Sequence, residues 1–248
     1  MSWIGLLLVG FAVTDLVFSV RPMRHVPEAV GASFAVLLGL LAGLTDARDL
    51  VALVVIAAAT VGWGQAVTRG FASDREWRPL ALFGVALTLA IAFSPYAGNA
   101  DGLVGRWLEV TPVAVLAGLD ADQALLLAGV MLAQLSTGNV LVRLVLAATG
   151  TVDPLRGSGR DVPTYRLKGG RLLGPLERVF IVGLGLAGEL TAASVVVAAK
   201  GLLRWPELQA ARDQHAGEPG IHQVTEYFLV GSFVSWMVAL GSLVLLGG

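Results

Sequence analysis

Long apolar runs separated by short polar segments dominate this sequence, and most of the runs show no polar stripe at helical spacing. Each run has roughly twenty residues, enough at about 1.5 Å per residue to cross a hydrocarbon core of about 30 Å. A soluble helix of that length would keep a polar face. The pattern predicts an all-α, polytopic transmembrane helical bundle, a single domain over residues 1–248. Its seven or so spans are residues 3–20, 28–45, 50–68, 79–96, 122–148, 175–199 and 225–246.

One further apolar run, residues 103–119, contains Arg106, Glu109 and Pro112, so we expect it to lie at the interface or to re-enter. With seven spans, the positive-inside rule puts the N-terminus outside and the C-terminus in the cytoplasm. We therefore expect a multi-pass protein of the inner (cytoplasmic) membrane. The cytoplasmic basic residues are then Arg21, Arg24, Arg69, Arg75, Arg78, Arg156, Arg160, Arg166, Lys168 and Arg171. The outer ones are Arg48, Arg106, Lys200, Arg204 and Arg212.

Composition agrees with a membrane protein and excludes several other classes. The 248 residues are 56% hydrophobic and 14% charged, whereas soluble domains carry about a quarter charged residues. A net charge of −1 argues against nucleic-acid binding. With no Cys, no histidine pair at metal spacing and no recognisable nucleophile motif, we expect no metal and no cofactor, and an enzyme is not favoured.

An acidic residue in the predicted span 175–199 is the first candidate for chemistry. Arg178, Glu189 and Lys200 are spaced by eleven residues, almost three helical turns, so they point much the same way. This spacing puts Glu189 near mid-membrane, where an ionised acid costs about 2.5–3.5 kcal/mol and should be paired, protonated or hydrated. Glu189 is then either a proton, cation or ligand site, or a neutral group that pins helix packing. Arg178 and Lys200 are nearer the interfaces and can snorkel.

Two other polar groups interrupt predicted spans. Asp15 either pairs with an arginine of another helix or bonds to Arg21 at its own helix end. Ser136 could cap a helix break with Asn139 and Arg143 on one face behind it, an arrangement suited to an anion. The alternative, which we favour, is a continuous helix with Arg143 snorkelling.

Three phrases in the C-terminal third resemble a bacterial membrane-protein family known only as a domain of unknown function. They are GRLLGPLER at 170–178, AAKGLLR at 198–204 and EYFLVGS at 226–232. The family has a serine where this chain has Gly201. The resemblance implies a similar membrane topology and marks candidate residues, but it implies no activity.

The same phrases suggest polar pairs that hold helices together. Lys200, Arg204 and Glu226 flank one predicted loop, so a pair among them could join the last two helices. Glu177 lies at the opposite membrane face and needs a partner from another element. Such pairs contribute about 0–1 kcal/mol when exposed and more when partly desolvated.

We therefore expect a protein that binds or conducts a small solute, ion or proton along a polar path that includes Glu189. The alternative is a non-catalytic accessory or regulatory membrane subunit, and a lipid-acting enzyme comes third. The expected surroundings are the lipid bilayer and either a membrane-protein partner or further copies of the chain.

Overall fold

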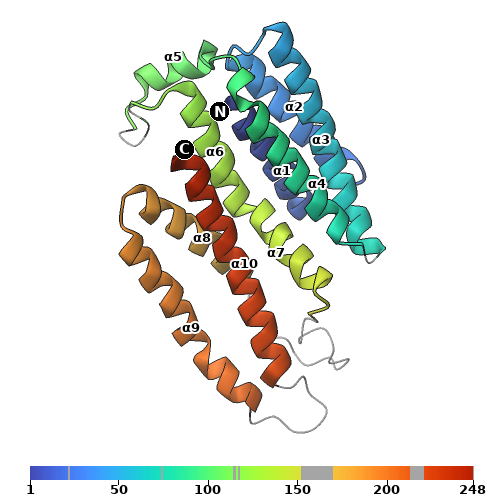
Figure 1. The fold of residues 1–248 in the computed structure, drawn as a ribbon, viewed down its shortest axis with the longest axis vertical. Helices are drawn as coiled ribbons and strands as arrows, with labels where there is room; N and C mark the ends of the chain where they lie inside the picture. Colours follow the sequence, from blue (N-terminus) through green and yellow to red (C-terminus); the bar gives the residue numbers. More distant parts are fainter. Residues whose placement is uncertain are drawn as a thin grey trace. The chain divides into compact units, whose positions relative to one another are not determined.

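The computed structural model describes residues 1–21, 23–73, 75–113, 116, 118–151, 170–212 and 221–247. Every regular element within these ranges is helical, as the sequence predicts (Figure 1). The helices pack into two compact units, residues 1–137 and 138–248.

The N-terminal unit is built around helix α1 (Ser2–Val20), which is buried on nearly all sides as far as Asp15. A helix that is apolar all round is stable only when other helices or lipid surround it. Here α1 contacts the four helices α2 (Val26–Leu41), α3 (Ala47–Ala72), α4 (Trp77–Phe93) and α6 (Ala121–Leu135). The 3-10 turn η1 (Ser94–Tyr96) and the short helix α5 (Gly102–Val110) connect α4 to α6.

Specific contacts fix the direction of each helix in this unit. The Trp3–Asp49 and Asp15–Trp63 hydrogen bonds make α1 and α3 parallel. The same holds for α1 and α6, because Ser2 bonds to Asp122 and Ser136 bonds to Ala12. Helix α2 runs the opposite way: a Cβ on its Gly31 would meet Thr14, whereas one on its Gly39 would meet Leu6.

Glycines allow the closest helix approach in this unit. A Cβ on Gly5 of α1 would lie 2.5 Å from the carbonyl oxygen of Leu125 in α6, and a Cβ on Gly129 of α6 would overlap the carbonyl oxygen of Gly5. Small residues of this kind let helix backbones touch in membrane bundles. The backbones of α1 and α6 therefore leave no room for a larger residue at either position.

Helix α7 (Thr137–Ala148) begins with the last residue of the N-terminal unit and otherwise belongs to the C-terminal unit. The rest of that unit comprises α8 (Gly170–Leu186), α9 (Leu190–Arg212) and α10 (Ile221–Gly247). Glu177 of α8 bonds to Trp236 of α10, and a Cβ on Gly185 of α8 would meet Leu243 of α10. These two contacts, eight and seven residues apart along the respective helices, make α8 and α10 parallel. Helix α9 packs against both and returns the chain between them (Figure 1).

Four described helical stretches are long and apolar enough to cross a membrane: Ser2–Val20, Ala47–Ala72, Trp77–Tyr96 and Thr225–Gly247. The bent pair of α6 and α7 adds a fifth if it is one span, and α2 is apolar but shorter. This architecture fits an integral membrane protein. It does not confirm seven spans.

Two predicted helices differ from the structure. The single span over 175–199 is wrong, because α8 ends at Leu186 and α9 begins at Leu190. Gly188 lies between them with a φ of +78°, a left-handed conformation that ends helices. The continuous helix over 122–148 is also wrong, since the chain breaks at Ser136.

Candidate functional site

A buried carboxyl group, Asp15, lies in the second half of α1, five residues before the end of that helix. Its side chain is 8% exposed. The indole Nε1 of Trp63 donates to both carboxyl oxygens at 3.1 Å, and the Thr137 hydroxyl donates to Oδ2 at 2.7 Å. Neither Arg21 nor any other basic side chain in the described ranges forms an ion pair with it. Within the described residues, two helices, α3 and α7, thus supply only neutral donors to this acid of α1.

Aromatic packing fixes the indole that serves Asp15. The Trp63 side chain is fully buried and stacks on Phe11, with ring centroids 5.2 Å apart and an interplanar angle of 17°. Phe83 of α4 lies 5.6 Å from the same indole ring. The donor is therefore held in place by its ring, independently of the bond that it makes.

A second acid, Glu28 in the first turn of α2, is buried close by. Its side chain is 8% exposed and packs against Gly64, where a Cβ would overlap it. Thr14 approaches the same glycine, to 3.1 Å from where a Cβ would stand. Asp15 and Glu28 therefore reach α3 at the adjacent residues Trp63 and Gly64.

The difference between the two acids is in their hydrogen bonding. Both oxygens of Asp15 accept a hydrogen bond, whereas the Oε2 of Glu28 is buried and has no partner among the described residues. A buried carboxyl oxygen without a hydrogen bond is costly, so Oε2 is the position in this cluster that is open to a further donor.

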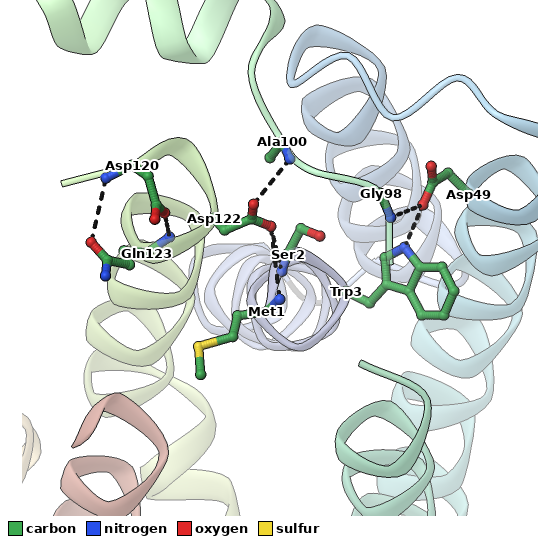
Figure 2. Close-up of polar contacts among 9 residues, drawn as sticks. All are labelled: Met1, Ser2, Trp3, Asp49, Gly98, Ala100, Asp120, Asp122 and Gln123. Carbon is green, nitrogen blue, oxygen red and sulfur yellow. Dashed lines mark hydrogen bonds and ion pairs between the residues drawn. The ribbon is translucent and has the colours of Figure 1, made fainter. Parts of the chain in front are cut away.

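Polar contacts at the opposite end of α1 are structural (Figure 2). Asp49 of α3 accepts hydrogen bonds on Oδ1 from the Trp3 indole at 2.9 Å and from the backbone N–H of Gly98 at 3.1 Å. The Trp3–Asp49 pair mirrors the Asp15–Trp63 pair, with indole and carboxylate exchanged between α1 and α3. Together the two pairs set the register of these helices.

A second aspartate, Asp122, holds the same end of the unit. It accepts hydrogen bonds from the backbone N–H groups of Ser2 at 3.1 Å and Ala100 at 3.0 Å, and the amino group of Met1 lies 3.7 Å away (Figure 2). Asp49 and Asp122 thus fasten residues 97–101 across the start of α1. Donors engage Oδ1 of Asp49 and both oxygens of Asp122. Among the described residues, no three His, Asp or Glu side chains gather as a metal site would need.

A buried arginine, Arg178, organises the C-terminal unit. Its side chain is 1% exposed and donates to Asn139 Oδ1 at 2.9 Å and to the Ser235 hydroxyl at 3.2 Å. A Cβ on Gly138 would lie 2.6 Å from its Nε, so only glycine leaves room for the guanidinium. The neighbouring Glu177 is also buried and accepts a hydrogen bond from the Trp236 indole at 2.8 Å.

The structure separates the predicted site residues. It brings Asn139 and Arg178 together, which the sequence did not suggest, and Arg143 lies one turn along α7 with its side chain exposed. Glu189 is not at mid-helix: it is exposed at the turn between α8 and α9. Its alignment with Arg178 and Lys200 on one helix face is therefore wrong.

The predicted polar pairs have mixed outcomes. Glu177 has a partner on another element, as expected, but the partner is a tryptophan of the last helix. The Glu226 side chain is exposed. The side chains of Lys200 and Arg204 lie outside the described residues, so a pair with Glu226 stays a prediction.

Glu28, Trp63, Ser235 and Trp236 were missed by sequence reasoning. Glu28 follows Pro27 at the start of an apolar run and looks like an ordinary first-turn acid. Trp63 and Trp236 lie inside apolar runs, where an indole N–H needs a partner. Because a buried indole N–H needs an acceptor, each tryptophan inside a predicted span indicates that an acceptor side chain lies near it.

No family model, curated protein or solved structure matches this chain. The resemblance of its C-terminal third to a family of unknown function therefore stays a prediction.

Proposed function

We propose that this is an integral membrane protein that binds a proton at Asp15 and Glu28 and passes it along a polar path in the N-terminal unit. The observation that carries the proposal is the buried Oε2 of Glu28, which has no hydrogen-bond partner in the described part of the chain and lies near a second buried acid. A proton needs a single oxygen, whereas a metal ion needs several ligands. Thr14 and Thr137 add hydroxyl groups that can donate or accept along the way.

The test is proton flux into liposomes that contain the purified protein and a trapped pH-sensitive dye, driven by a potassium diffusion potential. We expect Asp15→Asn and Glu28→Gln each to reduce the flux at least about tenfold, because an amide cannot take up the transported proton. Asp122→Asn is the matched control, since this aspartate is held by backbone donors at the other end of α1.

Glu189→Gln separates this site from the path expected from the sequence. Glu189 is exposed at a turn, so we expect its amide variant to retain wild-type flux. Flux lost in Glu189→Gln but kept in Asp15→Asn and Glu28→Gln would overturn the proposal, as would no flux above protein-free liposomes.

The second candidate is an accessory or regulatory subunit, and the C-terminal unit favours it. There, Arg178, Glu177 and Trp236 use their polar atoms to join α7, α8 and α10, which is how a structural polar cluster behaves. This function predicts a stable membrane-protein partner after mild detergent extraction and crosslinking. An active chain that purifies alone counts against it.

We also propose a membrane topology with both termini outside. Seven spans with a cytoplasmic C-terminus require α8 and α10 to run in opposite directions, but the Glu177–Trp236 and Gly185–Leu243 contacts support parallel helices. In this topology α6 and α7 form one broken span, and the α8–α9 hairpin begins and ends at the cytoplasmic face. Of the basic residues assigned to the two sides in the sequence analysis, only Arg48 and Arg106 then lie outside. This distribution follows the positive-inside rule more closely than the seven-span arrangement.

Reporter fusions at the C-terminus test the topology. Alkaline phosphatase is active only outside the cytoplasm and green fluorescent protein fluoresces inside it, so we expect an active phosphatase and a dark fluorescent protein. The reverse pattern would restore the seven-span arrangement with its cytoplasmic C-terminus.

A further inference from the structure

Helix α5 is too short to cross a bilayer and is fastened to one end of the N-terminal unit. Its nine residues span about 14 Å, half the thickness of a hydrocarbon core. The backbone N–H of Asp101, just before it, donates to the carbonyl oxygen of Ala42 at 2.8 Å. Gly102 follows with a φ of +56° and packs so closely on the end of α2 that a Cβ would lie 2.6 Å from the carbonyl oxygen of Leu41. The helix is thus anchored where α2 ends and α1 begins.

The outer surface of α5 is apolar. Leu108 faces the unit and is 8% exposed, whereas Leu103, Trp107 and Val110 are 53%, 54% and 77% exposed. The spacing of four and three residues puts the last three on one stripe, opposite Leu108. Arg106 is exposed at the edge of this stripe.

Two observations indicate what covers the stripe. Aromatic side chains at the end of the preceding candidate span, Phe93 and Tyr96, are 53% and 61% exposed, and such rings favour the headgroup level. The stripe therefore follows the end of a candidate span whose own exposed rings suit the lipid interface. Three side chains also offer far less area than the roughly 800 Å² per partner of a stable protein interface.

We infer that α5 lies flat in the lipid interface at the membrane face where α1 begins. Leu103, Trp107 and Val110 point toward the acyl chains, and Arg106 and Glu109 stay at headgroup level. The amphipathic arrangement is that of an interfacial helix. Because Asp49 and Asp122 fasten the segment just before it, α5 also anchors this end of the unit to the bilayer surface.

The absence of cysteine makes a direct test possible without background mutations. Single cysteines at Leu103, Trp107, Val110 and Glu109 are spin-labelled in the full chain, reconstituted in vesicles of phosphatidylcholine and phosphatidylglycerol. Collision with oxygen, which concentrates in lipid, is compared with collision with a water-soluble nickel chelate. Val54, a 68% exposed residue in the first third of α3, supplies the reference for lipid contact.

We expect labels at 103, 107 and 110 to show an oxygen-to-nickel ratio several-fold above that at 109, approaching the ratio at 54. A water-like ratio at the three stripe positions would overturn the inference. So would spin–spin broadening that grows with protein density, because a second copy would then cover the stripe. If Trp107→Cys fails to fold, labels at 103 and 110 give the same comparison.

Discussion

Asp15 in the N-terminal unit and Arg178 in the C-terminal unit are both buried, and neutral groups supply the hydrogen bonds described for each. They differ in what they can do with their charge. A carboxyl group can become neutral by taking a proton, whereas a guanidinium stays charged in proteins. In the same kind of surroundings, the carboxyl group can therefore change its charge and the guanidinium cannot. Our proposal accordingly gives proton binding to the acid and the joining of helices to the arginine.

The largest effect is expected where the permanent charge is removed. Arg178→Met leaves Asn139 and Ser235 without their donor and Glu177 without its neighbouring charge, which should destabilise the protein by about 3–5 kcal/mol. Unfolding in detergent with increasing denaturant measures this. Arg106→Met, at an exposed arginine of α5, is the control and should stay within about 0.5 kcal/mol. Equal decreases in the free energy of unfolding of the two variants would contradict a role for Arg178 in joining α7, α8 and α10.

A smaller loss is expected where only the space for that charge is reduced. Gly138→Ala places a Cβ 2.6 Å from Nε and 2.8 Å from Cζ of Arg178, so the guanidinium must shift, at about 1–3 kcal/mol. Gly183→Ala, in α8 with nothing within 4 Å of the new Cβ, should instead stabilise by up to about 1 kcal/mol. If Gly138→Ala lowers the unfolding temperature and Gly183→Ala raises it, the guanidinium is tightly packed against Gly138. A higher unfolding temperature for Gly138→Ala contradicts this packing.

On the acidic side, Trp63→Phe removes the indole donor to Asp15 but keeps an aromatic ring against Phe11. We expect a loss of about 1–2 kcal/mol, the cost of one buried hydrogen bond. Trp107→Phe, at an exposed position, is the matched control. If both variants unfold at the same denaturant concentration, the Trp63–Asp15 bond does not stabilise the unit.

The smallest change in stability is expected for Asp15→Asn, which preserves size and an acceptor oxygen for Trp63 or Thr137. It should change the free energy of unfolding by less than about 1 kcal/mol while it abolishes proton flux. This split between stability and flux is the sharpest test of the comparison. A loss as large as that of Arg178→Met would mean that Asp15 is a structural group as well.

Hydropathy was sufficient to predict an all-helical protein with apolar candidate spans, because lipid exposure is recorded in composition along the chain. It could not locate the helix breaks. The region around Gly188 remains apolar on both sides, and only the left-handed φ of that residue distinguishes a turn from a span. Ser136 offered the correct alternative, but local sequence could not decide between a break and a continuous helix.

The candidate site was predictable only in part for a related reason. Asp15 was evident as an acid inside a span, yet its donors are 48 and 122 residues away in the chain. Periodicity describes one helix at a time, so it carries no information on such pairings. The prediction for Glu189 failed because its mid-membrane position required a continuous helix over 175–199, which the chain does not form.

The long separations around Asp15 also have a consequence for biosynthesis. Helix α1 is synthesised before the helices that supply the hydrogen-bond donors of its acid. Trp63 becomes available only after two more helices have been synthesised, and Thr137 arrives at the start of α7. The N-terminal unit therefore cannot complete its core in the order in which its helices emerge from the ribosome. The Asp15 carboxyl group lacks its hydrogen bond from Thr137 until more than a hundred further residues have been synthesised.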